Sequence, residues 1–269
     1  MSRYKRLASN ALLIFVGNLG SKLIGLVMLP FYTRWLSVAD YGITDVIAIY
    51  TTLLLSVLTF CIAEAVFVFP KGKDKNKQKE YFSSGLIFSL GMLSIVAILL
   101  YLADEFFAVS SYLGEIGEYV WSVYWMVVAS LALQYLTQFS RSIDKIKVYA
   151  ISGIILTACT AILAFALIPE YGVRGFIAAQ ILSLIITTLY VLVYSEAYSF
   201  FSVKSVKYDI CREMLRYSTP LIPNGVMWWL VAALNRPIIE SNYGMESVGL
   251  FSVANKIPSL IAVVFSVFA

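Results

Sequence analysis

Residues 82–103 read FSSGLIFSLGMLSIVAILLYLA, a run that contains no charged side chain. A helix needs about 20 apolar residues to cross the hydrocarbon core of a bilayer, so this run is long enough to span it. Of the 269 residues, 60% are hydrophobic and only 13% are charged, with a mean hydropathy of +0.83. An ordinary soluble domain carries about 25% charged residues. The sequence therefore predicts an all-α fold, a polytopic membrane helical bundle.

Eight apolar segments predict eight transmembrane helices. They lie at 9–33, 43–69, 82–103, 119–139, 149–168, 174–195, 217–240 and 248–269. The first is not expected to be a cleaved signal, because its apolar stretch runs from Leu7 to Phe31, longer than the apolar region of about 7–15 residues that a signal peptide has. We expect it to stay in the protein as the first span.

The connections between these segments differ in charge. The N-terminus and the second-to-third, fourth-to-fifth and sixth-to-seventh connections are basic, with five lysines from Lys71 to Lys79, whereas the opposite connections are mainly acidic. Lysine and arginine accumulate on the cytoplasmic side. This predicts a multi-pass protein of the cell (inner or plasma) membrane with a cytoplasmic N-terminus. The five lysines are also typical of segments that bind anionic lipid or nucleic acid; we favour a topology anchor and expect no nucleic-acid partner.

An internal repeat relates the start of the chain to residues 207 positions later. Pro30 corresponds to Pro237 and Gly42 to Gly249. Six predicted spans separate the copies, so both enter the membrane in the same direction, as in parallel repeats that hold a substrate site between them. We predict a six-helix lobe at 1–205 and the start of a second lobe at 206–269. Because that second lobe has two of six expected helices, we expect the chain to be the front part of a longer transporter.

Charged side chains within the predicted spans are the candidate functional residues. Such groups are costly in a bilayer and usually face the bundle interior or a watery cavity. Lys22, Arg236 and Lys256 are therefore candidate cavity cations that bind substrate. Asp45 and Glu64 are candidate counter-ions or coupling sites for a proton or sodium ion, and an ion pair between Lys22 and either acid is the structural alternative. The candidate polar residues of the cavity are Asn18, Ser21, Asn224, Asn235 and Asn255.

A cavity with several cations favours an anionic substrate. Phosphate oxygens accept charge-assisted hydrogen bonds from such cations, and a diphosphate on a lipid carrier fits because its tail can remain in the bilayer. The chain has no histidine and three scattered cysteines, so we expect no metal, no cofactor and no catalytic residues. Coupling to a proton gradient, a sodium gradient or the membrane potential stays open, and an exporter of drugs or other small molecules is the alternative function.

Short motifs at the starts of the two predicted lobes resemble a known family. They are Ser21-Lys22-Leu23-Ile24-Gly25, Leu29-Pro30, Thr33-Arg34-Trp35-Leu36-Ser37, Asp40-Tyr41-Gly42 and the run from Val248 to Ile257. They are similar to the polysaccharide biosynthesis proteins, the O-antigen and capsule repeat-unit flippases of the multidrug/oligosaccharidyl-lipid/polysaccharide exporter superfamily. Ser21-Lys22-x-x-Gly25 also resembles the Ser-Arg-x-x-Gly element of lipid II flippases, which implies that Lys22 is a cavity cation.

The resemblance implies a two-lobed bundle of about 12 to 14 helices that moves undecaprenyl-diphosphate-linked oligosaccharide from the cytoplasmic to the outer leaflet. Such a protein serves the assembly of surface lipopolysaccharide or capsule. The implied partners are the lipid-linked oligosaccharide, membrane lipids and the polysaccharide polymerase machinery. The alternative that the resemblance leaves open is a multidrug or small-molecule exporter of the same superfamily.

Overall fold

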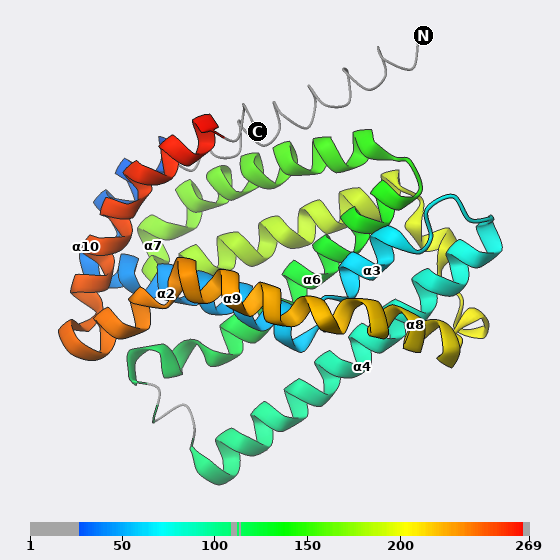
Figure 1. The fold of residues 1–269 in the computed structure, drawn as a ribbon. Coiled ribbons are helices and arrows are strands. Elements are labelled where there is room, and N and C mark those ends of the chain that lie inside the picture. Colours follow the sequence, from blue (N-terminus) through cyan, green and yellow to red (C-terminus); the bar gives the residue numbers. More distant parts are fainter. Residues whose placement is uncertain (1–26, 109–111, 113, 266–269) are drawn as a thin grey trace. The chain divides into compact units, whose positions relative to one another are not determined.

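The computed structural model describes residues 27–108, 112 and 114–265, with side chains described as far as Lys256. Within these ranges the chain forms helices and no strand (Figure 1), which confirms the all-α prediction. Four helical segments of this part are long and apolar enough to cross a membrane: α2 (Val38–Leu58), α4 (Lys75–Phe107), Gly114–Ser142 and α7 (Ile146–Tyr194). The full count of eight spans stays a prediction.

The remaining helices are shorter, apart from α10, which changes direction at Gly244. They are α3 (Ile62–Val68), η1 (Gly114–Tyr119), α6 (Val120–Ser142), η2 (Ala197–Phe200), η3 (Val203–Ser205), α8 (Tyr208–Ser218), η4 (Thr219–Leu221), α9 (Ile222–Ala233) and α10 (Asn235–Phe265). The 3-10 helix η1 leads directly into α6, so the two together make the third of the long apolar segments.

Two glycines reverse the chain inside the long helices. Gly172 in α7 has φ 55° and ψ −128°, and Gly244 in α10 has φ 78° and ψ 174°, conformations that residues with a Cβ rarely adopt. Pro169 precedes the first turn and has no N–H to continue the helix. Each turn falls between two predicted spans, so α7 covers the predicted spans 149–168 and 174–195, and its two legs run side by side (Figure 1).

The second predicted span is interrupted. The segment 43–69 was expected to be one helix, but α2 ends at Leu58 and α3 begins at Ile62. Phe60 and Cys61 between them have φ of 54° and 51°, in the left-handed region that costs a residue with a Cβ roughly 1–2 kcal/mol. Neither residue is a glycine or proline, so the sequence carries no ordinary signal for this break.

The chain divides into two compact units. Unit 1 comprises the described parts of Met1–Val46, Ile146–Thr187 and Asn235–Ala269, and unit 2 comprises Ile47–Lys145 and Thr188–Leu234. Met28, Leu36, Tyr41, Ala164 and Ile168 form a buried apolar cluster in unit 1. Leu93, Val127 and Leu131 form one in unit 2. The predicted lobes 1–205 and 206–269 stay a prediction.

The turn at Gly172 provides a stability test. Gly172→Ala should destabilise the protein by about 1–3 kcal/mol, because alanine must adopt a strained backbone conformation there, and the thermal unfolding midpoint of the detergent-solubilised chain should fall. Gly153→Ala is the matched control within α7, since no atom lies within 4 Å of a Cβ built there and Gly153 has ordinary helical geometry. This control should leave the midpoint unchanged or raise it; an equal fall in both variants would contradict the prediction.

Candidate functional site

A buried ion pair joins the start of α10 to α2 within unit 1. Arg236 Nε donates to Asp45 Oδ2 at 3.1 Å, and the side chains are only 9% and 13% exposed. Removing a charge from water costs several kcal/mol even after relaxation, so each of these groups depends on an opposite charge nearby. Arg236 Nη1 also donates to Asn235 Oδ1 at 2.9 Å, and its guanidinium lies 5.2 Å from the ring centre of Phe251.

Ser252 completes this cluster from the second half of α10. Its hydroxyl donates to the same Asp45 oxygen at 2.7 Å. The two residues are 207 positions apart, which is the offset of the internal repeat. Ser252 is thus the counterpart of Asp45 in the second copy of the repeat, and the two counterparts are hydrogen-bonded to each other. Sequence reasoning did not select Ser252 as a site residue, although the 207-residue offset relates it to Asp45.

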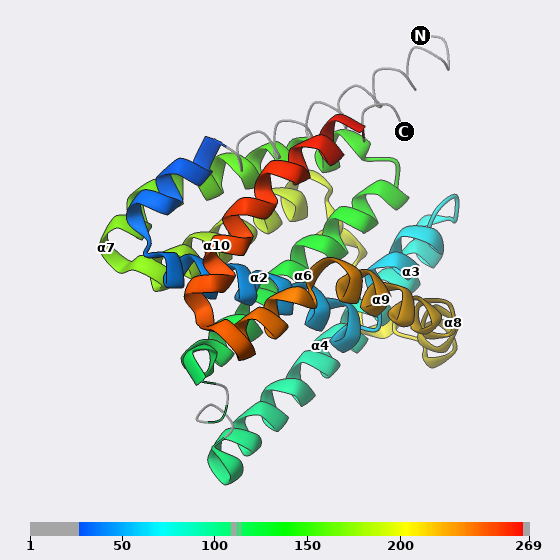
Figure 2. The same cartoon turned by 60° about the vertical axis from the view of Figure 1, so that its left-hand side comes forward.

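The helices α2 and α10 cross close to each other in unit 1 (Figure 2), and two glycines allow this close approach. A Cβ on Gly42 would collide with the carbonyl oxygen of Met245, and a Cβ on Gly249 would collide with that of Val38. Under the 207-residue offset, Met245 is the counterpart of Val38 and Gly249 that of Gly42. Contacts across a two-fold axis are reciprocal in this way. The α2–α10 contact thus has the pattern expected between two repeat-related helices.

The other predicted site residues are not part of the Asp45–Arg236 cluster as the structure describes it. Asn255 and Lys256 are exposed in α10, and Asn224 is exposed in α9, which belongs to unit 2. Asn18, Ser21 and Lys22 lie outside the described residues. The structure therefore brings together Asp45, Asn235 and Arg236, and the predicted roles of all these residues in binding or coupling stay predictions.

Glu64 belongs to a second polar chain, within unit 2. Gln138 Nε2 donates to Glu64 Oε1 at 3.1 Å, and Arg141 Nη1 donates to Gln138 Oε1 at 2.8 Å. The glutamine amide thus connects the carboxylate to a cation. The guanidinium of Arg141 also lies 4.4 Å from the ring centre of Phe67. Sequence reasoning missed Gln138, although its spacing of three residues from Arg141 is that of neighbours on a helix face.

These features define a class of protein: an α-helical chain with four helical segments, among the described residues, that are long and apolar enough to cross a membrane, and a buried charge cluster at a helix contact. The family model of polysaccharide biosynthesis proteins matches residues 7–269, and the chain belongs to this family. The resemblance inferred from the sequence motifs is thereby confirmed. No curated protein and no solved structure matches the chain. Among the described residues, no group of three or more histidine, cysteine, aspartate or glutamate side chains is placed to hold a metal ion.

A double-mutant cycle tests the buried pair. Asp45→Asn and Arg236→Gln should each destabilise the protein by about 3–5 kcal/mol, because each removes one half of a buried ion pair. The double variant should lose clearly less than the sum of the two, since it leaves no uncompensated charge. Ser252→Ala, which removes one hydrogen bond and no charge, should cost about 1–3 kcal/mol. The readout is chemical or thermal unfolding in detergent; strictly additive losses would show that the pair contributes no coupling.

Proposed function

We propose that this protein is a flippase that moves undecaprenyl-diphosphate-linked oligosaccharide from the cytoplasmic to the outer leaflet by alternating access between two lobes. The observation that carries this proposal is the buried Asp45–Arg236 pair at the contact of two repeat-related helices, in a chain of the polysaccharide biosynthesis family. Transporters built from parallel repeats place their substrate between the repeats, and a contact between the repeats must then open on one side to release it.

The α2–α10 contact is the proposed outer gate. Under the predicted topology, α2 starts at the outer face and α10 turns there at Gly244. Separating the helices exposes Asp45 and Arg236 to water, and the hydration that both charges regain offsets most of the lost attraction. A gate built on such a pair has open and closed states of similar free energy, so a bound ligand can shift the balance between them.

The proposed substrate contact is between cavity cations and the diphosphate. Lys22 and Lys256 supply charge for the phosphate oxygens, and Arg236 joins them once the gate opens, in charge-assisted hydrogen bonds. The lipid tail stays in the bilayer while the glycan crosses in water. A membrane potential that is negative inside assists outward movement of each negative charge by about 2.3 kcal/mol per 100 mV. Asp45 and Glu64 are the acids available for proton or sodium coupling, and the polysaccharide polymerase machinery is the proposed recipient.

Charge reversal in the first span tests the substrate site. The transporter that contains this chain together with its second lobe is reconstituted into vesicles with a fluorescent undecaprenyl-diphosphate oligosaccharide, and an impermeant quencher reports the leaflet that the label occupies. Lys22→Glu should abolish translocation, because it places a negative charge where the diphosphate binds, whereas Lys22→Arg should retain most of the activity. Lys147→Glu, an equal change in a predicted cytoplasmic connection, is the control and should remain active.

Normal translocation by Lys22→Glu would remove Lys22 from the site. The same vesicles also test the alternative function of an exporter. Transport of an organic cation, with no movement of the lipid-linked oligosaccharide, would contradict the flippase proposal and favour a multidrug exporter.

Accessibility of α10 tests the gate. In a chain whose cysteines at 61, 159 and 211 are replaced by alanine, Ser252→Cys places a thiol at a site that is 1% exposed. An impermeant maleimide added from the outside should label it slowly, and Asp45→Asn should speed the labelling about tenfold by favouring the open gate. Thr44→Cys, also buried in α2, should respond in the same direction. Equal labelling rates with and without Asp45 would refute the gate.

A further inference from the structure

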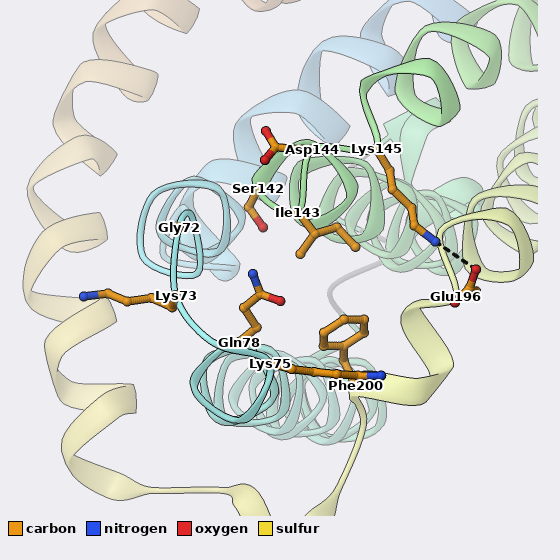
Figure 3. A pocket seen from close by; sticks show the side chains of 10 residues that line it. All are labelled: Gly72, Lys73, Lys75, Gln78, Ser142, Ile143, Asp144, Lys145, Glu196 and Phe200. Atoms are coloured by element: carbon orange, nitrogen blue, oxygen red, sulfur yellow. Dashed lines mark hydrogen bonds and ion pairs between the residues drawn. The ribbon is translucent and has the colours of Figure 1, made fainter.

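A polar pocket of about 400 Å³ lies within unit 2, where three of its connections meet (Figure 3). The lining residues come from the start of α4 and the loop before it, from the end of α6 and the loop after it, and from the turn that follows α7. They are Gly72, Lys73, Lys75, Gln78, Ser142, Ile143, Asp144, Lys145, Glu196 and Phe200. All three connections are on the predicted cytoplasmic side, and the proposed transport cycle does not use this pocket.

Two lysines from different connections converge on one short turn of this pocket. Lys145 Nζ contacts Glu196 Oε1 at 3.1 Å, and Lys75 Nζ lies 5.4 Å from the ring centre of Phe200. Glu196 and Phe200 are the two ends of the turn that contains η2. Figure 3 shows both lysines extending toward that side of the pocket, whereas Lys73 extends away from it. The pocket thus presents two ammonium groups, one of which shares its charge with a single carboxylate.

The turn is held firmly against α4. Ser83 Oγ donates to the carbonyl oxygen of Phe200 at 3.1 Å and accepts from the backbone N–H of Ser202 at 3.0 Å. Ser84 Oγ accepts from the backbone N–H of Lys207 at 3.0 Å. Both serines are buried, so these hydrogen bonds are shielded from water. The backbone at Phe200 is therefore held in place by α4.

The pocket lining contains three lysines and two acids, Lys73, Lys75 and Lys145 with Asp144 and Glu196, and the two connections that supply the lysines are basic. Residues 71–79 and 141–147 together contain eight lysines and arginines and two aspartates. Basic pockets on the cytoplasmic side of membrane proteins attract anionic lipid headgroups, and the attraction amounts to about 1 kcal/mol for each lysine or arginine near the surface. The lining lysines outnumber the lining acids by one, and the basic connections around the pocket add to this attraction.

An apolar groove continues from the same turn. Its volume is about 340 Å³, and it lies along α4, α6 and the end of α7. Its lining residues are Phe82, Leu86, Ala132, Tyr135, Leu136, Leu192, Tyr198 and Phe201. Tyr198 and Phe201 in this groove alternate along the chain with Glu196 and Phe200 of the polar pocket. A polar, cationic pocket and an apolar groove thus share one wall.

We propose that this paired pocket and groove bind an anionic phospholipid of the cytoplasmic leaflet. Lys75 and Lys145 bind the phosphate, Gln78 donates to a headgroup oxygen, and one acyl chain lies in the groove between α4 and α6. A free phosphate ion would use the lysines in the same way but would leave the groove unused. The apolar groove beside the cations therefore favours the lipid as the source of the phosphate.

Lipid binding to the purified full chain tests this proposal. Dioleoyl phosphatidylglycerol or dioleoyl phosphatidylcholine is titrated into the detergent-solubilised protein, and bound lipid is counted by native mass spectrometry. The wild type should prefer phosphatidylglycerol. Replacing both lysines, Lys75→Gln with Lys145→Gln, should weaken that binding about tenfold. The matched control is Lys79→Gln with Lys147→Gln, which removes the same charge from the same two connections but outside the pocket, and it should weaken binding by a clearly smaller factor than the pocket pair.

Two further variants separate a binding site from a structural contact. Glu196→Gln should strengthen phosphatidylglycerol binding several-fold, because Lys145 no longer shares its charge; a purely structural ion pair predicts no gain. Ala132→Phe should fill the groove and remove the preference for dioleoyl over dihexanoyl phosphatidylglycerol while the headgroup preference remains.

Three results would overturn the proposal. They are equal losses in the lysine pair and its control, equal binding of the two headgroups, and displacement of the lipid by inorganic phosphate at the same concentration. The last result would assign the pocket to a free anion. None of these readouts depends on transport, so the lipid site and the flippase proposal succeed or fail separately.

Discussion

A charge inside a membrane must be matched by an opposite charge or by water, and this constraint governs unit 1. Arg236 is buried, and its guanidinium forms an ion pair with the carboxylate of Asp45. The pair forms because Gly42 and Gly249 let the backbones of α2 and α10 come close together. The two glycines thus allow the helix contact that places the charged side chains of Asp45 and Arg236 next to each other. The two helices stay in close contact while the charges are paired, and the two charged groups become hydrated when the helices separate.

The long apolar helices and the two glycine turns follow from sequence. The break between α2 and α3 does not, and neither does the division of the predicted span 217–240 among α8, η4, α9 and α10. Long apolar runs predict the helices because each must satisfy its own backbone hydrogen bonds in lipid. Gly172 and Gly244 fall between predicted spans, where a change of direction is expected. Phe60 and Cys61, in contrast, are ordinary residues within an apolar run and still adopt left-handed conformations. Packing against other helices overrides local preference there, and one sequence does not contain that information.

The same division holds for the candidate site. Asp45 and Arg236 each stood out as a charge within an apolar run, since the cost of burial makes such residues rare. Their partnership was not predictable, because 191 residues separate them and spacing on a helix says nothing about partners on another helix. Ser252 is the exception: the repeat offset connects it to Asp45, and a repeat specifies which residues can meet across its axis. The repeat offset does not point to Gln138, whose signal in the sequence is its spacing of three residues from Arg141.

The two proposed sites use charge in opposite ways, and their burial follows from this difference. A gate requires charges that are satisfied in the closed state, so Arg236 and Asp45 are buried together and shielded from other ligands. A lipid site requires charges that remain available, so Lys75 is exposed and Lys145 keeps a third of its side chain in contact with water. Exposed ion pairs contribute about 0–1 kcal/mol, so the Lys145–Glu196 pair yields easily to a phosphate group. The buried Arg236 pair yields only when the helices around it move.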